Sequence, residues 1–369
     1  MEKVVVIVGA GLSALSCAHR LAESTAHPLR IVLLEGRDRV GGRLLGQNGI
    51  DLGAAWSWST DTPLQLLSKS MGVNFEPQHK SGKALVQDAS GRVGVYGEGV
   101  SPSGDGSTRF QNGVQSVASK LAESLVAGGA SIELNTRVVS VDQNDGTVRV
   151  AAVTVSGEPR SFTADVVVVA MPPRLAVQLQ FVPALSAAKI DAMHRTPTWM
   201  GGTGKVAFIY PTAFWRREGL SGTSFSQTGP MQQVWDNSAA DGSVHALAGF
   251  VFGDDLEELE SDPQALKVSP IMQQLVALFG EEAASPTRIV CKSWAHDPFT
   301  THLGTQNGGD RGHRGGSDLG FGSREVRSPH LRVLFAGTET APGEHGHMNG
   351  AVVAGYRAAA EALEVLRSV

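Results

Sequence analysis

Short apolar runs alternate with amphipathic stretches in the first third of the chain. Residues 4–8 form a continuous β-branched run, which is typical of a strand buried on both faces of a parallel sheet. Residues 15–24 repeat apolar side chains at helical spacing, and residues 29–34 form a second apolar run that ends at Glu35. The order strand, helix, strand predicts a β-α-β unit with a right-handed crossover.

The same two patterns recur along the rest of the chain. Helical spacing predicts helices over residues 62–71, 112–126, 186–194, 270–279 and 351–369. Apolar runs predict strands over residues 131–134, 138–142, 148–155, 166–170, 205–210, 245–252 and 331–336. Residues 76–107 are rich in glycine, serine and charge, so we expect short strands there at best. The glycine-rich residues 303–322 show no periodicity and predict a long loop.

Composition narrows the class of protein. The 369 residues suit about two domains. A hydrophobic content of 41% with 18% charged residues indicates a globular chain rather than a disordered one. The net charge of −5 gives no reason to expect nucleic acid or an acidic membrane surface as a partner.

Cysteine usage and the apolar runs bear on the compartment. Two cysteines predict no disulfide framework and favour a reducing compartment. No apolar run reaches the about 18 residues of a membrane span, and the run 4–8 is too short for a signal peptide. We therefore expect a soluble, cytoplasmic protein without a signal peptide or a membrane anchor.

A dinucleotide-binding fingerprint follows the first predicted strand. Gly9 allows a tight turn, Gly11 has no side chain to block a pyrophosphate, and Ala14 is small enough for the helix to pack on the strand. The helix N-terminus presents free N–H groups and a partial positive charge to the phosphates. Glu35 follows 24 residues after Gly11, at the end of the second strand, where its carboxylate is expected to bond the ribose hydroxyls of an adenosine.

The residues after Glu35 separate FAD from NAD. A second glycine pair, Gly41 and Gly42, again permits close backbone approach, and Arg43 can neutralise a phosphate. Residues 51–56 then add another tight segment of small side chains. An NAD site does not need these extra contacts, whereas a longer, flavin-bearing dinucleotide does, so the sequence predicts FAD.

With these motifs in place, the chain resembles the flavin-containing monoamine oxidase family along its whole length. The matching segments are residues 4–43, 110–113, 137–139, 169–173, 335–340 and 346–351. The resemblance implies a Rossmann-like FAD-binding domain of the glutathione-reductase and p-hydroxybenzoate-hydroxylase type, with a smaller substrate domain of mixed sheet and helices. The predicted FAD-binding domain spans residues 1–60, 106–175 and 295–369, and the substrate domain spans residues 61–105 and 176–294.

The candidate cofactor-binding residues lie at turns and strand ends. They are Gly9, Gly11, Leu12, Ser13, Ala14, Glu35, Gly36, Arg37, Gly41, Gly42, Arg43, Gly53, Ala54, Ala55, Trp56, Val138, Val139, Ala170, Pro172, Trp294, Gly337, Thr338, Glu339, Gly346, His347, Met348 and Ala351. The resemblance also implies that the last helix, near Met348, points its N-terminus at the pyrimidine end of the flavin. Trp56 and His347 are in addition the candidates for contact with substrate.

Lys205 is the candidate catalytic residue. The segment 205–210 followed by Phe214 and Trp215 has the spacing of the family's lysine-bearing strand, and the resemblance implies that Lys205 holds a water to flavin N5 and assists the reaction with oxygen. The alternative is a strand-end lysine that extends to solvent. The implied reaction transfers hydride from the amine α-carbon to flavin N5, releases an imine and reduces O2 to H2O2. Its partners are therefore a small-molecule amine and molecular oxygen.

Two features of the family are absent here. Some members attach FAD to a cysteine nine residues after the tryptophan that corresponds to Trp294; that position is Leu303, so we predict non-covalent FAD. The tyrosines of the amine-guiding aromatic cage are also missing, because their positions correspond to Gly304 and His347. We expect no metal site, since the His and Asp spacing in residues 296–313 fits no standard one.

Other functions stay open at this point. The region between Trp56 and Phe110 is short, and with the segment up to Arg43 it is similar to renalase, a flavoprotein that oxidises dihydronicotinamide compounds. A renalase-like oxidase, another FAD-dependent dehydrogenase or desaturase, and a non-catalytic flavin-binding protein are the alternatives to an amine oxidase.

Overall fold

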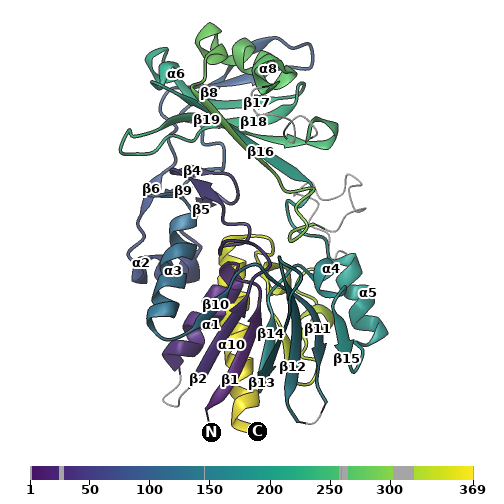
Figure 1. The fold of residues 1–369 in the computed structure, drawn as a ribbon. Helices are drawn as coiled ribbons and strands as arrows, with labels where there is room; N and C mark the ends of the chain where they lie inside the picture. The colour runs from purple at the N-terminus through teal and green to yellow at the C-terminus, as the bar shows by residue number, and fades with distance from the viewer. Residues whose placement is uncertain are drawn as a thin grey trace.

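The computed structural model describes residues 2–24, 29–144, 146–256, 259, 265–301 and 320–368. Figure 1 shows two parts, one above the other: the lower part contains both termini, and the upper part is built around a large sheet. The chain crosses between them several times, so residues far apart in the sequence lie at the junction.

A parallel sheet forms the centre of the lower part. Its strands, in the spatial order β10-β2-β1-β14-β21, are Ser131–Glu133, Leu29–Leu34, Lys3–Val8, Val166–Val169 and Val333–Phe335. Val5 and Ile7 face one core cluster and Val6 and Val8 another, all at most 4% exposed. Burial on both faces explains why β1 is a continuous β-branched run.

Helices cover one face of this sheet and a second sheet covers the other. On the first face lie α1 (Leu12–Ser24), α3 (Gln115–Ala127) and α10 (Met348–Ser368). On the second face lies the sheet β13-β12-β11-β15, with strands Pro159–Ala164, Val148–Thr154, Thr136–Asp142 and Gln180–Val182. Beside it are α4 (Pro173–Ala176) and α5 (Ala187–Arg195), and α9 (Arg324–Arg327) contacts α5.

A seven-stranded sheet forms the upper part. Its strands, in the order β20-β16-β19-β18-β17-β7-β8, are Arg288–Ser293, Thr203–Tyr210, His245–Phe252, Met231–Asp236, Leu220–Ser226, Lys83–Gln87 and Val93–Glu98. Val206 and Phe208 of β16 pack in one cluster with α8 (Pro270–Phe279), close to α6 (Phe214–Arg217). Because side chains alternate along a strand, Lys205 and Ala207 point to the opposite face.

Short elements join the two parts. They are β3 (Gly46–Gln47), β4 (Ile50–Asp51), β5 (Trp56–Ser57), α2 (Thr62–Ser70), β6 (Phe75–Pro77) and β9 (Thr108–Phe110). Leu64 and Leu67 of α2 pack in the core that α1 and α10 share. The exact domain ranges stay a prediction.

The α/β class and the Rossmann-like β-α-β unit are confirmed. The predicted helices and strands are present with small shifts at their ends. Helix α10 begins three residues before the start that its periodicity predicts, at Met348, where the resemblance placed its N-terminus. In the three largest sheets, the sequence did not predict β13, β15, β17, β18 and β20. Strand β13 is largely exposed, and β17 buries Ser221 and Thr223, so neither carries the apolar pattern of a strand. Most of the expected loop 303–322 lies outside the described residues.

Candidate cofactor and substrate site

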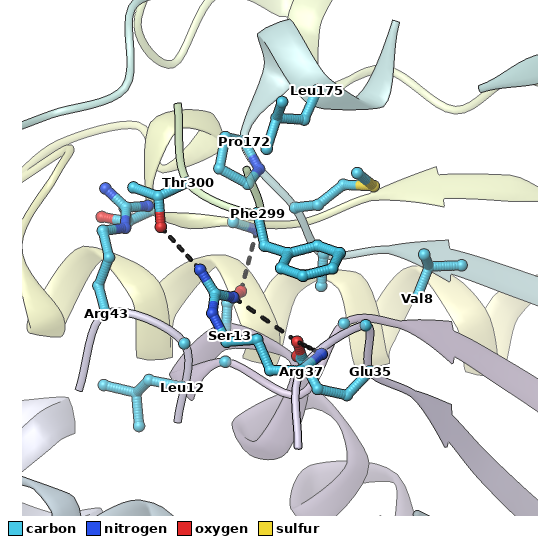
Figure 2. Close-up of a pocket in the computed structure, with 18 of the residues that line it drawn as sticks. Val8, Leu12, Ser13, Glu35, Arg37, Arg43, Pro172, Leu175, Phe299 and Thr300 are labelled. Atoms are coloured by element: carbon cyan, nitrogen blue, oxygen red, sulfur yellow. Dashed lines mark hydrogen bonds and ion pairs between the residues drawn. The ribbon is translucent and has the colours of Figure 1, made fainter. Parts of the chain in front are cut away.

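A cavity of about 610 Å³ lies at the carboxyl ends of the parallel strands. Most of the predicted cofactor-binding residues line it: Gly9, Gly11, Leu12, Ser13, Glu35, Gly36, Arg37, Gly41, Gly42, Arg43, Ala54, Val138, Val139, Ala170, Pro172, Gly337, Thr338, Glu339, Gly346, His347, Met348 and Ala351. Figure 2 shows part of this lining. Parallel α/β sheets bind ligands at this edge, and we call this cavity the first cavity.

The two glycines of the fingerprint differ in what requires them. Gly9 has a φ of +103°, and a Cβ there would lie 2.8 Å from the Ala170 carbonyl oxygen, so the fold itself needs glycine. A Cβ on Gly11 would meet only two atoms, both at 4.0 Å, and Gly11 has no positive φ. The protein does not occupy the space beside Gly11, which lines the first cavity, so the small residue there leaves room for a ligand. Ala14 is fully buried in the core below α1 and does not line the cavity.

The Glu35 carboxylate is fixed by backbone donors. The N–H of Ala10 donates to Oε2 at 2.8 Å, and the N–H of Arg37 donates to Oε1 at 3.0 Å. Glu35 is 4% exposed and stands at the end of β2. A carboxylate held in this way can still accept hydrogen bonds from ribose hydroxyls, as the sequence predicts.

A segment that the sequence analysis missed covers one side of the first cavity. Arg37 donates to Asp297 at 2.5 Å. It also donates to Thr300 at 2.8 Å, and its guanidinium lies 5.3 Å from the ring centre of Phe299 (Figure 2). A Cβ on Gly36 would lie 2.3 Å from the same ring. Burial raises the pKa of Asp297, but the Arg37 charge and the contact with Lys292 outweigh it and hold the pKa below its ordinary value. In the sequence, the feature that could have indicated this contact is the Asp-Pro-Phe segment at residues 297–299, shortly after Trp294.

Arg43 is paired within the protein. Its guanidinium lies 2.7 Å from the Glu339 carboxylate, which is fully buried, and it donates to the Trp199 carbonyl at 3.3 Å. The phosphate contact expected of Arg43 therefore has to be shared with Glu339. Both residues line the first cavity.

Two hydrogen bonds fix the C-terminal segment. The N–H of Gly337 donates to Ser13 Oγ at 3.0 Å, and Thr338 Oγ1 donates to the His347 carbonyl at 2.8 Å. Residues 337–339 and 346–348 consequently reach the same cavity as the fingerprint, more than 300 residues away.

A second cavity, of about 410 Å³, adjoins the first. Arg43, Ala54, Gly346, His347 and Met348 line both cavities. The other predicted residues of the site lie here and not in the first cavity: Gly53, Ala55, Trp56, Trp294 and Lys205.

Lys205 is buried among aromatic rings and does not extend to solvent. It is 2% exposed, and Nζ donates to the Gly53 carbonyl at 2.5 Å. Nζ also lies 5.8, 5.1 and 5.2 Å from the ring centres of Trp56, Trp235 and Phe250. Burial lowers the pKa of Lys205 to about 7, because the ammonium loses hydration that the rings replace only in part.

Tryptophans surround His347 in the second cavity. The rings of Trp58 and Trp199 lie 6.0 and 5.4 Å from the His347 ring, and Trp199 packs against Gly346, where a Cβ would lie 2.0 Å from its ring. All four residues line this cavity. The sequence analysis looked for tyrosines and did not identify Trp58 or Trp199, which lie in segments without a periodic pattern.

Comparisons with known proteins identify the family of this chain. A family model described as flavin containing amine oxidoreductase matches residues 98–363, and one for an NAD(P)-binding Rossmann-like domain matches residues 7–67. The chain belongs to the flavin-containing amine oxidoreductase family. It is accordingly a flavoprotein of the monoamine oxidase-like type, an oxidoreductase that acts on amines.

Individual relatives extend the likeness along the chain. The flavin-containing amine oxidase A of Equus caballus is 25% identical over 99% of this chain and 86% of its own length. A flavin-containing amine oxidase of Danio rerio is 29% identical over 80% of this chain and 54% of its own length. A wild-type putrescine oxidase bound to putrescine has the same fold, with a TM-score of 0.81, 21% identity and 99% coverage of both chains. Cyclohexylamine oxidase from Brevibacterium oxydans gives a TM-score of 0.80 at 22% identity, with both chains fully covered.

No helix among the described residues is both long enough and apolar enough to cross a membrane.

The contrast between Gly9 and Gly11 yields a test of the first cavity. We expect Gly11→Ala to leave the apoprotein's melting temperature almost unchanged and to weaken FAD binding by at least about tenfold, because the new methyl group occupies ligand space. Gly9→Ala should lower the melting temperature itself, since the strain and the contact with Ala170 exist without ligand. Flavin fluorescence titration and thermal melts measure the two effects. Equal FAD affinity in the wild type and Gly11→Ala would place the pyrophosphate elsewhere.

Proposed function

We propose that this protein is an FAD-dependent oxidase of small-molecule amines, with FAD in the first cavity and the amine in the second. The observation that carries the proposal is the meeting of the two cavities at Arg43, Ala54 and residues 346–348, with Lys205 buried in the wall of the second. Because the two cavities share these lining residues, an amine in the second cavity would lie next to FAD in the first.

The residues of the first cavity suit FAD. The free space beside Gly11 suits a pyrophosphate, and Glu35 suits the adenosine ribose. Helix α10 begins at Met348, which lines both cavities, so its N-terminal N–H groups can stabilise negative charge on the flavin's pyrimidine end. When bound, FAD supplies a two-electron acceptor that takes a hydride from the carbon beside the amine nitrogen and passes the electrons to O2, giving H2O2.

The residues of the second cavity would select and orient the amine. The aromatic side chains of Trp56, Trp58, Trp199, Phe250 and Trp294 contribute apolar surface to its walls, which favours a neutral amine at the reacting end. A neutral amine needs no carboxylate to remove its proton before hydride leaves. Lys205 would hold a water near the reacting atoms and assist the reduction of oxygen through its positive charge.

We further propose that FAD is held non-covalently. Cys17 is buried in the lower core, the Cys291 thiol donates to the Leu259 carbonyl, and neither cysteine lines either cavity. Leu303, the position of the flavin-linking cysteine in some relatives, lies outside the described residues.

Acid precipitation tests the mode of attachment. We expect yellow, FAD-loaded protein to release essentially all of its flavin into the supernatant, because no bond survives unfolding. Flavin that stays on the precipitate through washing would demonstrate a covalent link.

Anaerobic reduction tests the function. We expect the absorbance of oxidised flavin to bleach when the FAD-loaded protein is mixed with amines and to remain when it is mixed with NADH, NADPH or their isomers. Air should then restore the colour with one H2O2 formed per flavin. Bleaching by dihydronicotinamides alone would favour a renalase-like oxidase, bleaching by amines without recovery in air would favour a dehydrogenase, and no bleaching would favour a flavin-binding protein without catalysis.

Lys205→Met tests the proposed role in oxygen reduction. We expect the rate constant for reaction of reduced protein with O2 to fall by about 100-fold, since the variant loses a positive charge where negative charge develops. The pKa of Lys205 is lowered to about 7, so the ammonium is charged below pH 7 and neutral above it. The wild-type rate should therefore decrease as the pH rises through 7, and the variant should show no such step. Stopped-flow mixing with oxygenated buffer measures both.

A second buried lysine provides the control. Lys189 donates to the carbonyls of Glu325, Val326 and Ser328 and lines neither cavity. Lys189→Met removes a comparable charge but should leave the rate constant per bound flavin unchanged. If both variants slow the reaction equally, Lys205 has no specific role in it.

A further inference from the structure

Asp61 is the only carboxylate among the described residues that line the second cavity. It is 6% exposed and precedes helix α2, where it occupies the N-cap position. The ordinary interpretation of an aspartate at this position is a helix cap, whose side chain accepts the N–H of the second or third helical residue.

Asp61 does not act as this cap. The second helical residue is Pro63, which has no N–H, and the N–H of the third, Leu64, donates to Asn349 Oδ1 at 3.0 Å. Asp61 accordingly makes no side-chain cap hydrogen bond. Helix α10, through Asn349, satisfies the donor that Asp61 would otherwise bind.

The two oxygens of the Asp61 carboxylate differ in their hydrogen bonding. Oδ2 accepts the N–H of Trp58 at 2.9 Å, which fixes the side chain, while Oδ1 has no partner among the described residues. Neither Arg43 nor Lys205, which line the same cavity, forms an ion pair with Asp61. Arg43 pairs with Glu339, and Lys205 is directed to the Gly53 carbonyl. A nearly buried carboxylate without a cation is costly, although the N-terminus of α2 offsets part of this cost.

We propose that Asp61 binds a cationic group of the substrate at a distance from the amine that is oxidised, so the preferred substrates are diamines. The proposal rests on the proposed function above. A ligand cation would supply the charge that the cavity lacks, and Trp58, whose backbone already holds Asp61, adds an indole ring to the same cavity. The reacting end, neutral, loses two electrons and two protons to become an imine while O2 becomes H2O2. The distal ammonium is unchanged.

Substrate preference in an isosteric variant tests the proposal. We expect wild-type kcat/KM to be higher for a terminal alkanediamine than for the monoamine of the same chain length. In Asp61→Asn, which keeps an acceptor for Trp58, this ratio should fall by about 10- to 100-fold, mainly through KM. Asp105→Asn is the matched control, because Asp105 has a 92% exposed side chain and pairs with Lys80 on the surface. It should leave the ratio unchanged. Equal ratios in all three proteins would overturn the proposal even though amines are oxidised.

A binding measurement separates this proposal from the amine oxidase function. Bis(trimethylammonium) alkanes have no N–H and cannot be oxidised to an imine, so their binding to the FAD-loaded protein needs no turnover. We expect them to raise the melting temperature more than the matching alkyltrimethylammonium ions do, and Asp61→Asn should abolish the difference. A dication preference that depends on Asp61, found in a protein that no amine reduces, would support the cation site and reject the oxidase. No dication preference in the wild type would reject the site.

Discussion

Helix α10 can pack against helix α1 only because residue 355 has no side chain. A Cβ on Gly355 would lie 2.4 Å from the Ser13 carbonyl oxygen and 3.0 Å from the Cys17 nitrogen. This close approach fixes the start of α10 beside the β1–α1 turn, where Ser13 also binds Gly337. Residues from both ends of the chain are thereby held around the first cavity. The second cavity depends on the same contact, since residues 346–348 line both.

Buried charge is distributed unevenly around the two cavities. In the first, Glu35 is held by backbone donors, while Arg37 with Asp297 and Arg43 with Glu339 form ion pairs. In the second, Lys205 is surrounded by rings and one carbonyl, and Asp61 keeps an oxygen without a partner among the described residues. The Glu339 oxygens have no hydrogen-bond partner among the described residues, so charge attraction to Arg43 alone compensates this carboxylate. Each cavity thus contains a buried carboxylate that the described residues do not fully hydrogen-bond: Glu339 in the first and Asp61 in the second.

At the start of helix α2, the N-cap residue makes no capping hydrogen bond with its side chain. Pro63 removes one donor and Asn349 takes the next, so the fold does not need the Asp61 side chain as a cap. Asn349 is adjacent to Met348 at the start of α10, and Met348 lines both cavities. Any shift of α10 would act on both cavities at once.

The sequence by itself determined the β-α-β unit, the fingerprint and the family. These depend on local periodicity and on residues close together in the chain, such as Gly9, Gly11 and Glu35, whose roles follow from backbone geometry. Only the tertiary structure decided which face of β16 carries Lys205, that Phe299 covers Gly36, and that Trp58, Trp199 and Asp61 share a cavity. Those contacts join segments separated by tens to hundreds of residues, and side-chain spacing along the chain carries no information about them. That the Asp61 side chain does not cap its helix also depends on a distant residue: besides Pro63, it is Asn349, 288 residues away, that takes the N–H of Leu64.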